Sequence, residues 1–154
     1  GLYWWWHNYI EPYNLYRHYK PIAKFVSDAD WPAYRWKAVR LTRPNLPICL
    51  DVYGLVADDR ALIWIHDPMA FRVIDAEPVR GPSQAAASVN VAGLADGNYE
   101  VEWWDTLTGQ IIRRDAANVD HLQHFGYGIE LNPPGFWGDI AARIIRHGRQ
   151  WKKN

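Results

Sequence analysis

The opening run of three consecutive tryptophans has the clearest chemical potential in this sequence. Trp4, Trp5 and Trp6 precede His7 and Asn8, so three flat apolar rings adjoin two polar side chains. An indole offers a broad apolar face and a single N–H donor. That combination suits the C–H-rich face of a sugar ring, with polar neighbours bonded to its hydroxyls. The competing interpretation is a buried strand whose aromatic side chains fill a core, and composition alone favours that interpretation.

A pair of carboxylates is the second feature that could carry chemistry. Glu100 and Glu102 alternate with apolar residues and should point to the same side of a strand. Two carboxyl groups on one face are the equipment of a glycosidase acid/base pair. We favour a solvent-facing role instead, with Glu102 opposite Arg113, and we therefore assign no catalytic residue to this chain.

Potential metal ligands and nucleophiles are few. Asp120, His121 and His124 form a polar cluster. The two histidines could share a metal, but no third ligand has the spacing of a metal site, so we expect a loop. The single cysteine, Cys49, excludes an internal disulfide and is expected to pack in a strand rather than react. We expect neither a metal nor another cofactor.

Length and charge exclude several classes of protein. The chain has 154 residues, with 17 basic and 17 acidic side chains, and it also has ten tryptophans and nine tyrosines. This length suits one ordinary domain, or a small domain plus part of another. The zero net charge argues against nucleic acid or an anionic membrane as a partner. No apolar run reaches about 18 residues, so we expect no membrane-spanning helix.

The first 26 residues predict a strand followed by a helix. The bulky apolar residues 1–7 are typical of a strand that is buried on both faces. Asn14 is positioned to cap a helix that runs to about Val26, and Pro21 should kink or shorten it. The expected apolar stripe of this helix consists of Leu15, Tyr19, Ile22 and Val26.

The rest of the chain predicts a mainly β fold, an antiparallel β-sandwich of about seven strands. We expect strands at about 48–56, 60–66, 86–92, 98–105, 110–116, 126–131 and 139–146. The predicted organisation is a strand and helix at 1–27, a connector at 28–47, a sandwich at 48–147 and a basic tail at 148–154.

One hairpin of this sandwich can be predicted pair by pair. A four-residue turn at 106–109, with Gly109 free to take a positive φ, joins the strands at 98–105 and 110–116. The expected pairs are Asp105 with Gln110, Trp104 with Ile111, Trp103 with Ile112, and Glu102 with Arg113. The core face of the first strand should carry Tyr99, Val101 and Trp103.

Two stretches resemble parts of a known enzyme family. Residues 1–26 run GLYWWWHNYIEPYNLYRHYKPIAKFV and resemble the end of the (β/α)8 barrel in the glycoside hydrolase clan that includes cellulases and β-mannanases. In that clan the eighth strand is rich in tryptophan, and a loop similar to YIEPYNLY leads into the eighth helix. The sequences ALIWI at 61–65 and GLADGNYEVEWWDTLTG at 93–109 resemble the β-sandwich that often follows such barrels.

This resemblance implies that the chain is the C-terminal part of a secreted or periplasmic glycosidase. Its sugar-binding residues would be Trp4, Trp5, Trp6, His7 and Asn8, beside the bond that is cleaved. His7 stands where the relatives commonly carry an Asp, and it cannot supply the same fixed charge. The catalytic glutamates of the family lie on barrel strands absent from this sequence, so the chain alone should be inactive. Its partners would be carbohydrate and either the missing barrel or another copy of the chain.

Two other interpretations remain open. A structural or oligomerising sandwich would use the exposed apolar opening strand to pair with a second copy. A non-catalytic carbohydrate-binding module would need a row of exposed aromatic side chains on one face, formed by Trp64, Trp104 and Trp137. An isolated helix at residues 1–7 would count against the barrel interpretation.

Overall fold

The structure is a computed structural model, which describes residues 2–40, 50–68, 70, 73–74, 77–78, 88–120 and 128–149. The helical segments are α1 (Leu2–Trp5), the π-helical turn η1 (Trp6–Ile10), the 3₁₀ helix η2 (Leu15–Tyr19) and α2 (Lys20–Val26). The strands are β1 (Lys37–Arg40), β2 (Asp51–Ala57), β3 (Arg60–His66), β4 (Val73–Ile74), β5 (Glu77–Pro78), β6 (Val89–Val91), β7 (Gly97–Asp105), β8 (Gln110–Val119), β9 (Ile129–Leu131) and β10 (Asp139–Arg146).

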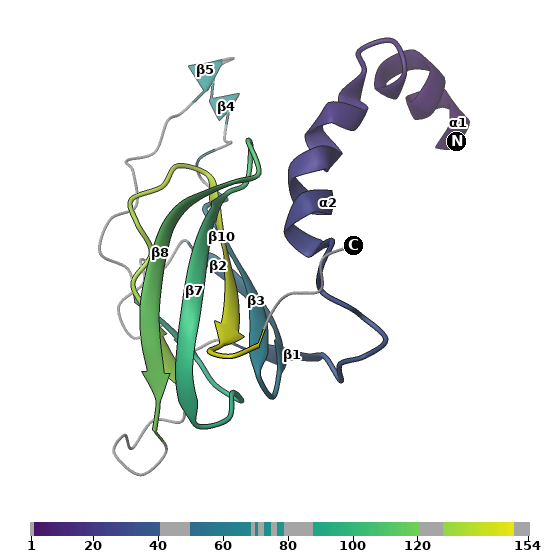
Figure 1. Ribbon diagram of the computed structural model, residues 1–154. Coiled ribbons are helices and arrows are strands. Elements are labelled where there is room, and N and C mark those ends of the chain that lie inside the picture. Colours follow the sequence, from purple (N-terminus) through teal and green to yellow (C-terminus); the bar gives the residue numbers. More distant parts are fainter. Residues whose placement is uncertain are drawn as a thin grey trace.

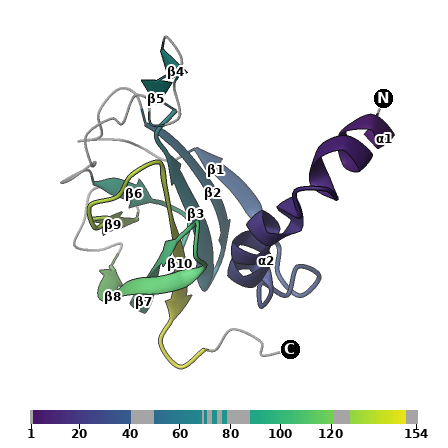
Figure 2. The same cartoon turned by 90° about the horizontal axis from the view of Figure 1, so that it is seen from above.

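The strands form a mainly antiparallel β fold in two packed layers, which confirms the predicted fold class. One layer is a six-stranded sheet in the order β1-β2-β3-β10-β7-β8, and the other contains the pair β6–β9. Side chains from both layers interdigitate in one buried cluster. Figure 2 shows β6 and β9 on one side of the large sheet and α2 on the other.

The inner core is built on β7 as the sequence predicts. Tyr99, Val101 and Trp103 are all buried, because alternate residues of a strand point to the same face. The Tyr99 hydroxyl donates to the carbonyl oxygen of Ala95 at 2.6 Å, four residues upstream. This local bond resembles the tyrosine corner found in immunoglobulin-like sandwiches. It fixes the entry of the chain into β7.

The outer face of the six-stranded sheet is also apolar and is covered by α2. Phe25 of the helix packs with Leu62, Trp104 and Ala141 of the sheet in a second buried cluster. Two-sided burial explains why β3 and β10 consist of nearly continuous apolar residues rather than alternating ones. Figure 1 shows α2 standing alongside these strands.

The predicted β7–β8 hairpin is correct near the turn and wrong beyond it. Asp105 pairs with Gln110 and Trp104 with Ile111, and Gly109 has the expected positive φ of 65°. A β-bulge between Trp103 and Trp104 then shifts the register, so the next pairs are Trp103 with Arg113 and Glu102 with Arg114. A bulge places one extra residue opposite its partner strand. Here the extra residue is Ile112, which is exposed.

The prediction of a strand at residues 1–7 is wrong for the part that the structure describes. Residues 2–10 are helical, and a backbone bond from Glu11 N–H to Trp6 O at 3.1 Å continues the helical pattern. A strand needs neighbours that accept and donate its backbone hydrogen bonds. Among the described residues no strand pairs with this segment, so its backbone is bonded within the helix instead.

The predicted helix at 14–26 is divided in two. Asn14 does not cap it through its side chain, and its backbone is left-handed with φ 48° and ψ 49°. A 3₁₀ helix comes first, and the α-helix begins only at Lys20, with Pro21 in its first turn where proline fits best. The predicted apolar stripe is also displaced: Pro21 and Phe25 are buried, whereas Tyr19 and Ile22 are exposed.

The predicted strands are found with shifted ends, and short strands were missed. Strands β2, β3, β6, β7, β8, β9 and β10 correspond to the seven expected segments. The connector at 28–47 contains a further strand, β1, which pairs with β2 at the edge of the large sheet. The short pair β4–β5 was not predicted either. The predicted strand starts near 48, 86 and 126 lie outside the described residues.

Replacing Tyr99 by phenylalanine tests the corner bond. Tyr99→Phe should lower the free energy of unfolding by about 1–2 kcal/mol, because the partly buried carbonyl of Ala95 loses its donor. Tyr53→Phe is the matched control: that side chain is 60% exposed, and its loss should change stability by less than about 0.5 kcal/mol. Urea denaturation measures both variants.

The wild-type protein and Tyr99→Phe also give a prediction about how stability depends on pH. Burial raises the pKa of Tyr99 above its ordinary value of 10.0. The unfolded chain therefore loses this proton first, and wild-type stability should fall as the pH rises from about 10. Tyr99→Phe lacks the titrating hydroxyl. The difference in free energy of unfolding between wild type and this variant should therefore become smaller between pH 8 and pH 10.5. A constant difference across that range would contradict the assignment.

Candidate functional site

The predicted sugar-binding residues all lie on one projecting segment, residues 2–19, which we name the aromatic arm. Trp4, Trp5 and Trp6 are 56%, 59% and 44% exposed, and His7 and Asn8 are exposed too. In Figures 1 and 2 the arm extends away from the sandwich. Neither η1 nor η2 contains a buried residue. The sequence pattern placed these residues on a buried strand, whereas they lie on exposed helical turns.

Aromatic contacts within the arm hold its rings in two groups. Trp4 and Trp5 both pack against Tyr9, with centroid separations of 5.3 and 5.0 Å, and Trp6 packs edge-on against Tyr16 at 5.5 Å. Such pairs stabilise by about 0.5–1.5 kcal/mol beyond the area they bury. The rings remain largely open to solvent, so the arm is a surface with no enclosed site of its own.

The polar side chains of the arm bond to one another. Trp6 Nε1 donates to Glu11 Oε1 at 3.2 Å, and His7 Nδ1 lies 3.4 Å from Glu11 Oε2. Asn8 Nδ2 donates to the carbonyl oxygen of Trp4 at 2.7 Å. These bonds cap and brace the helical turns. They do not bring two carboxylates together, so the arm holds no general acid and base of its own.

The carboxylates of β7 form ion pairs with an arginine of β8. Arg114 Nε lies 3.1 Å from Glu100 Oε1, and Arg114 NH2 lies 3.0 Å from Glu102 Oε1. The partner is Arg114 rather than the predicted Arg113, because the bulge shifts the register by one residue. Glu102 also faces Arg143 at 3.9 Å.

Metal binding finds no support within the described ranges. No group of three His, Cys, Asp or Glu side chains comes together there. Asp120 is described, whereas His121, His124 and Cys49 lie outside the described residues. None of the helices in those same ranges is long and apolar enough to cross a bilayer.

The row of exposed aromatic side chains that a carbohydrate-binding module would need is not formed by Trp64, Trp104 and Trp137. Trp104 is 4% exposed and lies beneath α2, so it cannot meet a ligand. Trp137 is exposed, while Trp64 is half-buried and contacts Phe25 edge-on at 6.0 Å. Alternation along the strand places Trp104 on the face opposite Trp103, but it cannot indicate that a helix covers that face.

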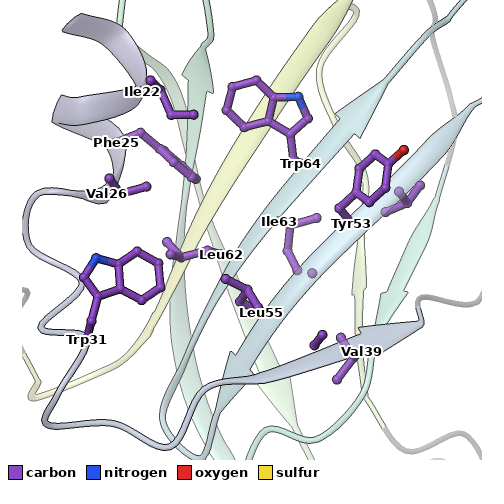
Figure 3. Close-up of a pocket in the computed structure, with 13 residues that line it drawn as sticks. Ile22, Phe25, Val26, Trp31, Val39, Tyr53, Leu55, Leu62, Ile63 and Trp64 are labelled. Atoms are coloured by element: carbon purple, nitrogen blue, oxygen red, sulfur yellow. The ribbon is translucent and has the colours of Figure 1, made fainter. Parts of the chain in front are cut away.

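A groove of about 400 Å³ lies between α2 and the outer face of β1, β2 and β3. Leu55, Leu62, Tyr53 and Trp64 form its floor, and Figure 3 shows Ile22, Phe25, Val26 and Trp31 on the side of the helix and the turn that follows it. Sequence analysis missed this groove. The available signal was in β2, where Tyr53 and Leu55 alternate with Val52 and Val56 and so indicate a second apolar face.

Two polar contacts fasten α2 and the turn that follows it to the large sheet. Lys24 Nζ donates to the carbonyl oxygen of Gly109 at 2.7 Å, and Arg143 NH2 lies 3.4 Å from Asp28 Oδ2. Gly109 is required here because a Cβ would lie 2.9 Å from Pro21 Cα. Burial lowers the pKa of Arg143, while Glu102 and Asp28 act to raise it. The helix and the sheet therefore form one unit.

Comparison with known proteins gives little. No protein-family model and no curated protein matches this chain. A solved structure described as a glycoside hydrolase is a structural neighbour, with a TM-score of 0.37 and 8% sequence identity over 71% of this chain. The chain spans about a fifth of that neighbour, 22% of its length. A likeness of this size carries no argument about function.

Removing Phe25 tests whether α2 is anchored as described. Phe25 is 6% exposed and contacts Trp64 and Trp104 edge-on. Phe25→Ala should lower the free energy of unfolding by about 3–5 kcal/mol, the range for a buried aromatic. Ile22→Ala, one turn away and exposed, should cost less than about 1 kcal/mol. Equal effects in urea denaturation would show that the helix does not pack on this face.

Proposed function

We propose that this chain is the C-terminal part of a glycoside hydrolase, in which the aromatic arm contributes a sugar-binding wall and the sandwich is an accessory domain. The observation that supports this most directly is the arm's exposed aromatic surface. Residues 4–19 carry exposed side chains at Trp4, Trp5, Trp6, Tyr9, Tyr13, Tyr16 and Tyr19. Exposed aromatic side chains at this density on one segment are typical of an interaction site.

The chemistry of the arm favours carbohydrate over a purely apolar partner. Indole and phenol rings stack on the C–H faces of sugars, and their N–H and O–H groups bond hydroxyls. His7 and Asn8 add polar groups along the same turns. The resemblance of residues 1–26 to the end of a cellulase-like barrel agrees with this chemistry. The helical form counts against a barrel strand, so the proposal rests on composition and exposure.

The described residues do not supply the two catalytic carboxyl groups that a glycoside hydrolase needs. Glu100 and Glu102 of β7 are held in ion pairs with Arg114. The arm, residues 2–19, carries no pair of carboxylates. We therefore place the two catalytic carboxyl groups in a preceding barrel of the same protein. The sandwich, fastened to α2 by Phe25 and Lys24, holds the arm at one place beside that barrel.

The natural coding sequence and the protein it encodes test this proposal. The sequence upstream of Gly1 should encode about 250–300 residues of alternating strands and helices, with a Glu at the ends of two strands. That longer protein should hydrolyse β-1,4-linked glucan or mannan oligosaccharides, and the 154-residue chain alone should not. An upstream sequence without such a barrel, or a folded longer protein inactive on both glycans, would refute the proposal.

Single substitutions in the longer protein test the arm itself. At least one of Trp4→Ala, Trp5→Ala and Trp6→Ala should lower kcat/KM by roughly tenfold or more, through loss of about 1.4 kcal/mol of stacking. Trp137→Ala removes an exposed tryptophan outside the arm and should leave kcat/KM unchanged. The reverse pattern, with only Trp137→Ala impaired, would support a binding role for the sandwich and contradict a role for the arm.

A further inference from the structure

A second hollow, away from the arm, is lined by charge rather than by apolar side chains. It measures about 510 Å³ and lies at the end of the sandwich where the β2–β3 turn, the end of β10 and the segment before β1 meet. We name it the basic pocket. Its charged lining consists of Arg35, Lys37, Arg146 and Arg149, with Asp58 and Asp59.

Positive charge predominates in this pocket, and much of it is uncompensated. Asp59 is already engaged, because its Oδ1 lies 2.9 Å from Arg60 Nε and its Oδ2 lies 3.6 Å from Arg149 Nε. Within the described part of the chain, no carboxylate lies within 4.0 Å of Arg35, Lys37 or Arg146. Four exposed cations therefore line this hollow with two carboxylates, Asp58 and Asp59, so its lining is net positive in a protein with no net charge.

The frame of the pocket is held in place by contacts that do not involve the charged side chains of these cations. The guanidinium of Arg60, which is itself buried, lies 3.7 Å from the centre of the Tyr34 ring. Backbone bonds of 2.9 Å join Ala95 N–H to Asp58 O and Arg146 N–H to Asp59 O. A site that is already formed loses less conformational entropy when it binds a ligand.

Gly97 lies beside one of the cations. A Cβ at Gly97 would lie 2.6 Å from Arg146 Nε, so the Arg146 side chain lies directly against β7 at this point. Guanidinium groups bind carboxylates through two parallel hydrogen bonds, with a preference for a fixed orientation.

We propose that the basic pocket binds an acidic saccharide, an oligosaccharide that carries carboxylates on its sugar rings. Four cations in one hollow can meet more than one oxyanion, and the volume of about 510 Å³ lies in the range of organic ligand sites rather than that of a single ion. The small side chains of Ala33, Ala57 and Ala95 leave room for sugar rings between the charges. The choice of a saccharide rests on the proposed function, whereas the preference for an anion does not.

Isothermal titration of the 154-residue chain tests this proposal with three probes: trigalacturonate, neutral cellotriose and inorganic phosphate. Trigalacturonate should bind, with an affinity that falls as sodium chloride is raised, because the contacts are between charges. Cellotriose should not bind at this pocket, and phosphate should bind at least tenfold more weakly than trigalacturonate. No binding of trigalacturonate, or equal affinity for phosphate, would overturn the assignment of an acidic saccharide.

Matched charge variants locate the binding. Arg35→Gln combined with Lys37→Gln should weaken trigalacturonate binding by about tenfold or more, because two charge-assisted contacts are lost. Lys20→Gln combined with Arg114→Gln removes the same charge from exposed positions outside both the arm and the basic pocket, and should change the affinity less than twofold. Equal weakening by both pairs would mean non-specific attraction and would overturn the proposal. Thermal unfolding of each variant verifies that it is folded.

The two proposals fail separately. The titration needs no catalysis and uses the 154-residue chain, whereas the proposed function is judged by hydrolysis in the longer protein. Trigalacturonate binding without glycosidase activity would retain the basic pocket and remove the enzyme role. Hydrolysis without trigalacturonate binding would do the opposite.

Discussion

The structure depends on one constraint: its six-stranded sheet is apolar on both faces, so both faces need a cover. The consecutive residues Trp103 and Trp104 show this directly, because one indole enters the inner core and the other lies on the outer face. The inner face is covered by β6 and β9. In the described part of the chain the outer face is covered by Phe25 of α2 and by Ala29 and Trp36 from the segment after it, and the apolar groove beside β1 and β2 remains open. The position of α2 is thus set by the sheet rather than by the helix's own propensity.

Alternation along single strands was enough to predict the sandwich. Tyr99, Val101 and Trp103 could be assigned to the core from their spacing, since a period of two has one meaning in a strand. The same rule failed at the β7–β8 hairpin, where the bulge shifts Glu102 from Arg113 to Arg114. Both registers pair acid with base, so local complementarity could not distinguish them. The shift depends on the sheet's twist and packing, which no pair of strands encodes alone.

Sequence reasoning was least successful where one segment depends on another. The edge strand β1 is four residues long and lies among turn-forming residues, so it has no periodic signal. The helix stripe was displaced for a related reason: Pro21 and Phe25 meet the sheet because α2 begins at Lys20, and the predicted start at Asn14 implied a different face. The position of a helix's first residue determines which side chains share a face. An error in that start therefore becomes an error in the core.

The aromatic arm poses a different problem, because its backbone and its side chains have unequal partners. The helical bonds satisfy the polar groups of residues 2–10, as the bond from Glu11 N–H to Trp6 O shows. Among the described residues, the rings of its tryptophans pack against one another and the nearby tyrosines, and they stay about half exposed. Hydrogen bonds can be completed locally, whereas burial of three indoles needs a surface larger than the arm itself. The exposed feature of the arm is therefore its apolar rings rather than a hydrogen-bonding edge, and an apolar surface can pack against these rings without any change in the helical backbone.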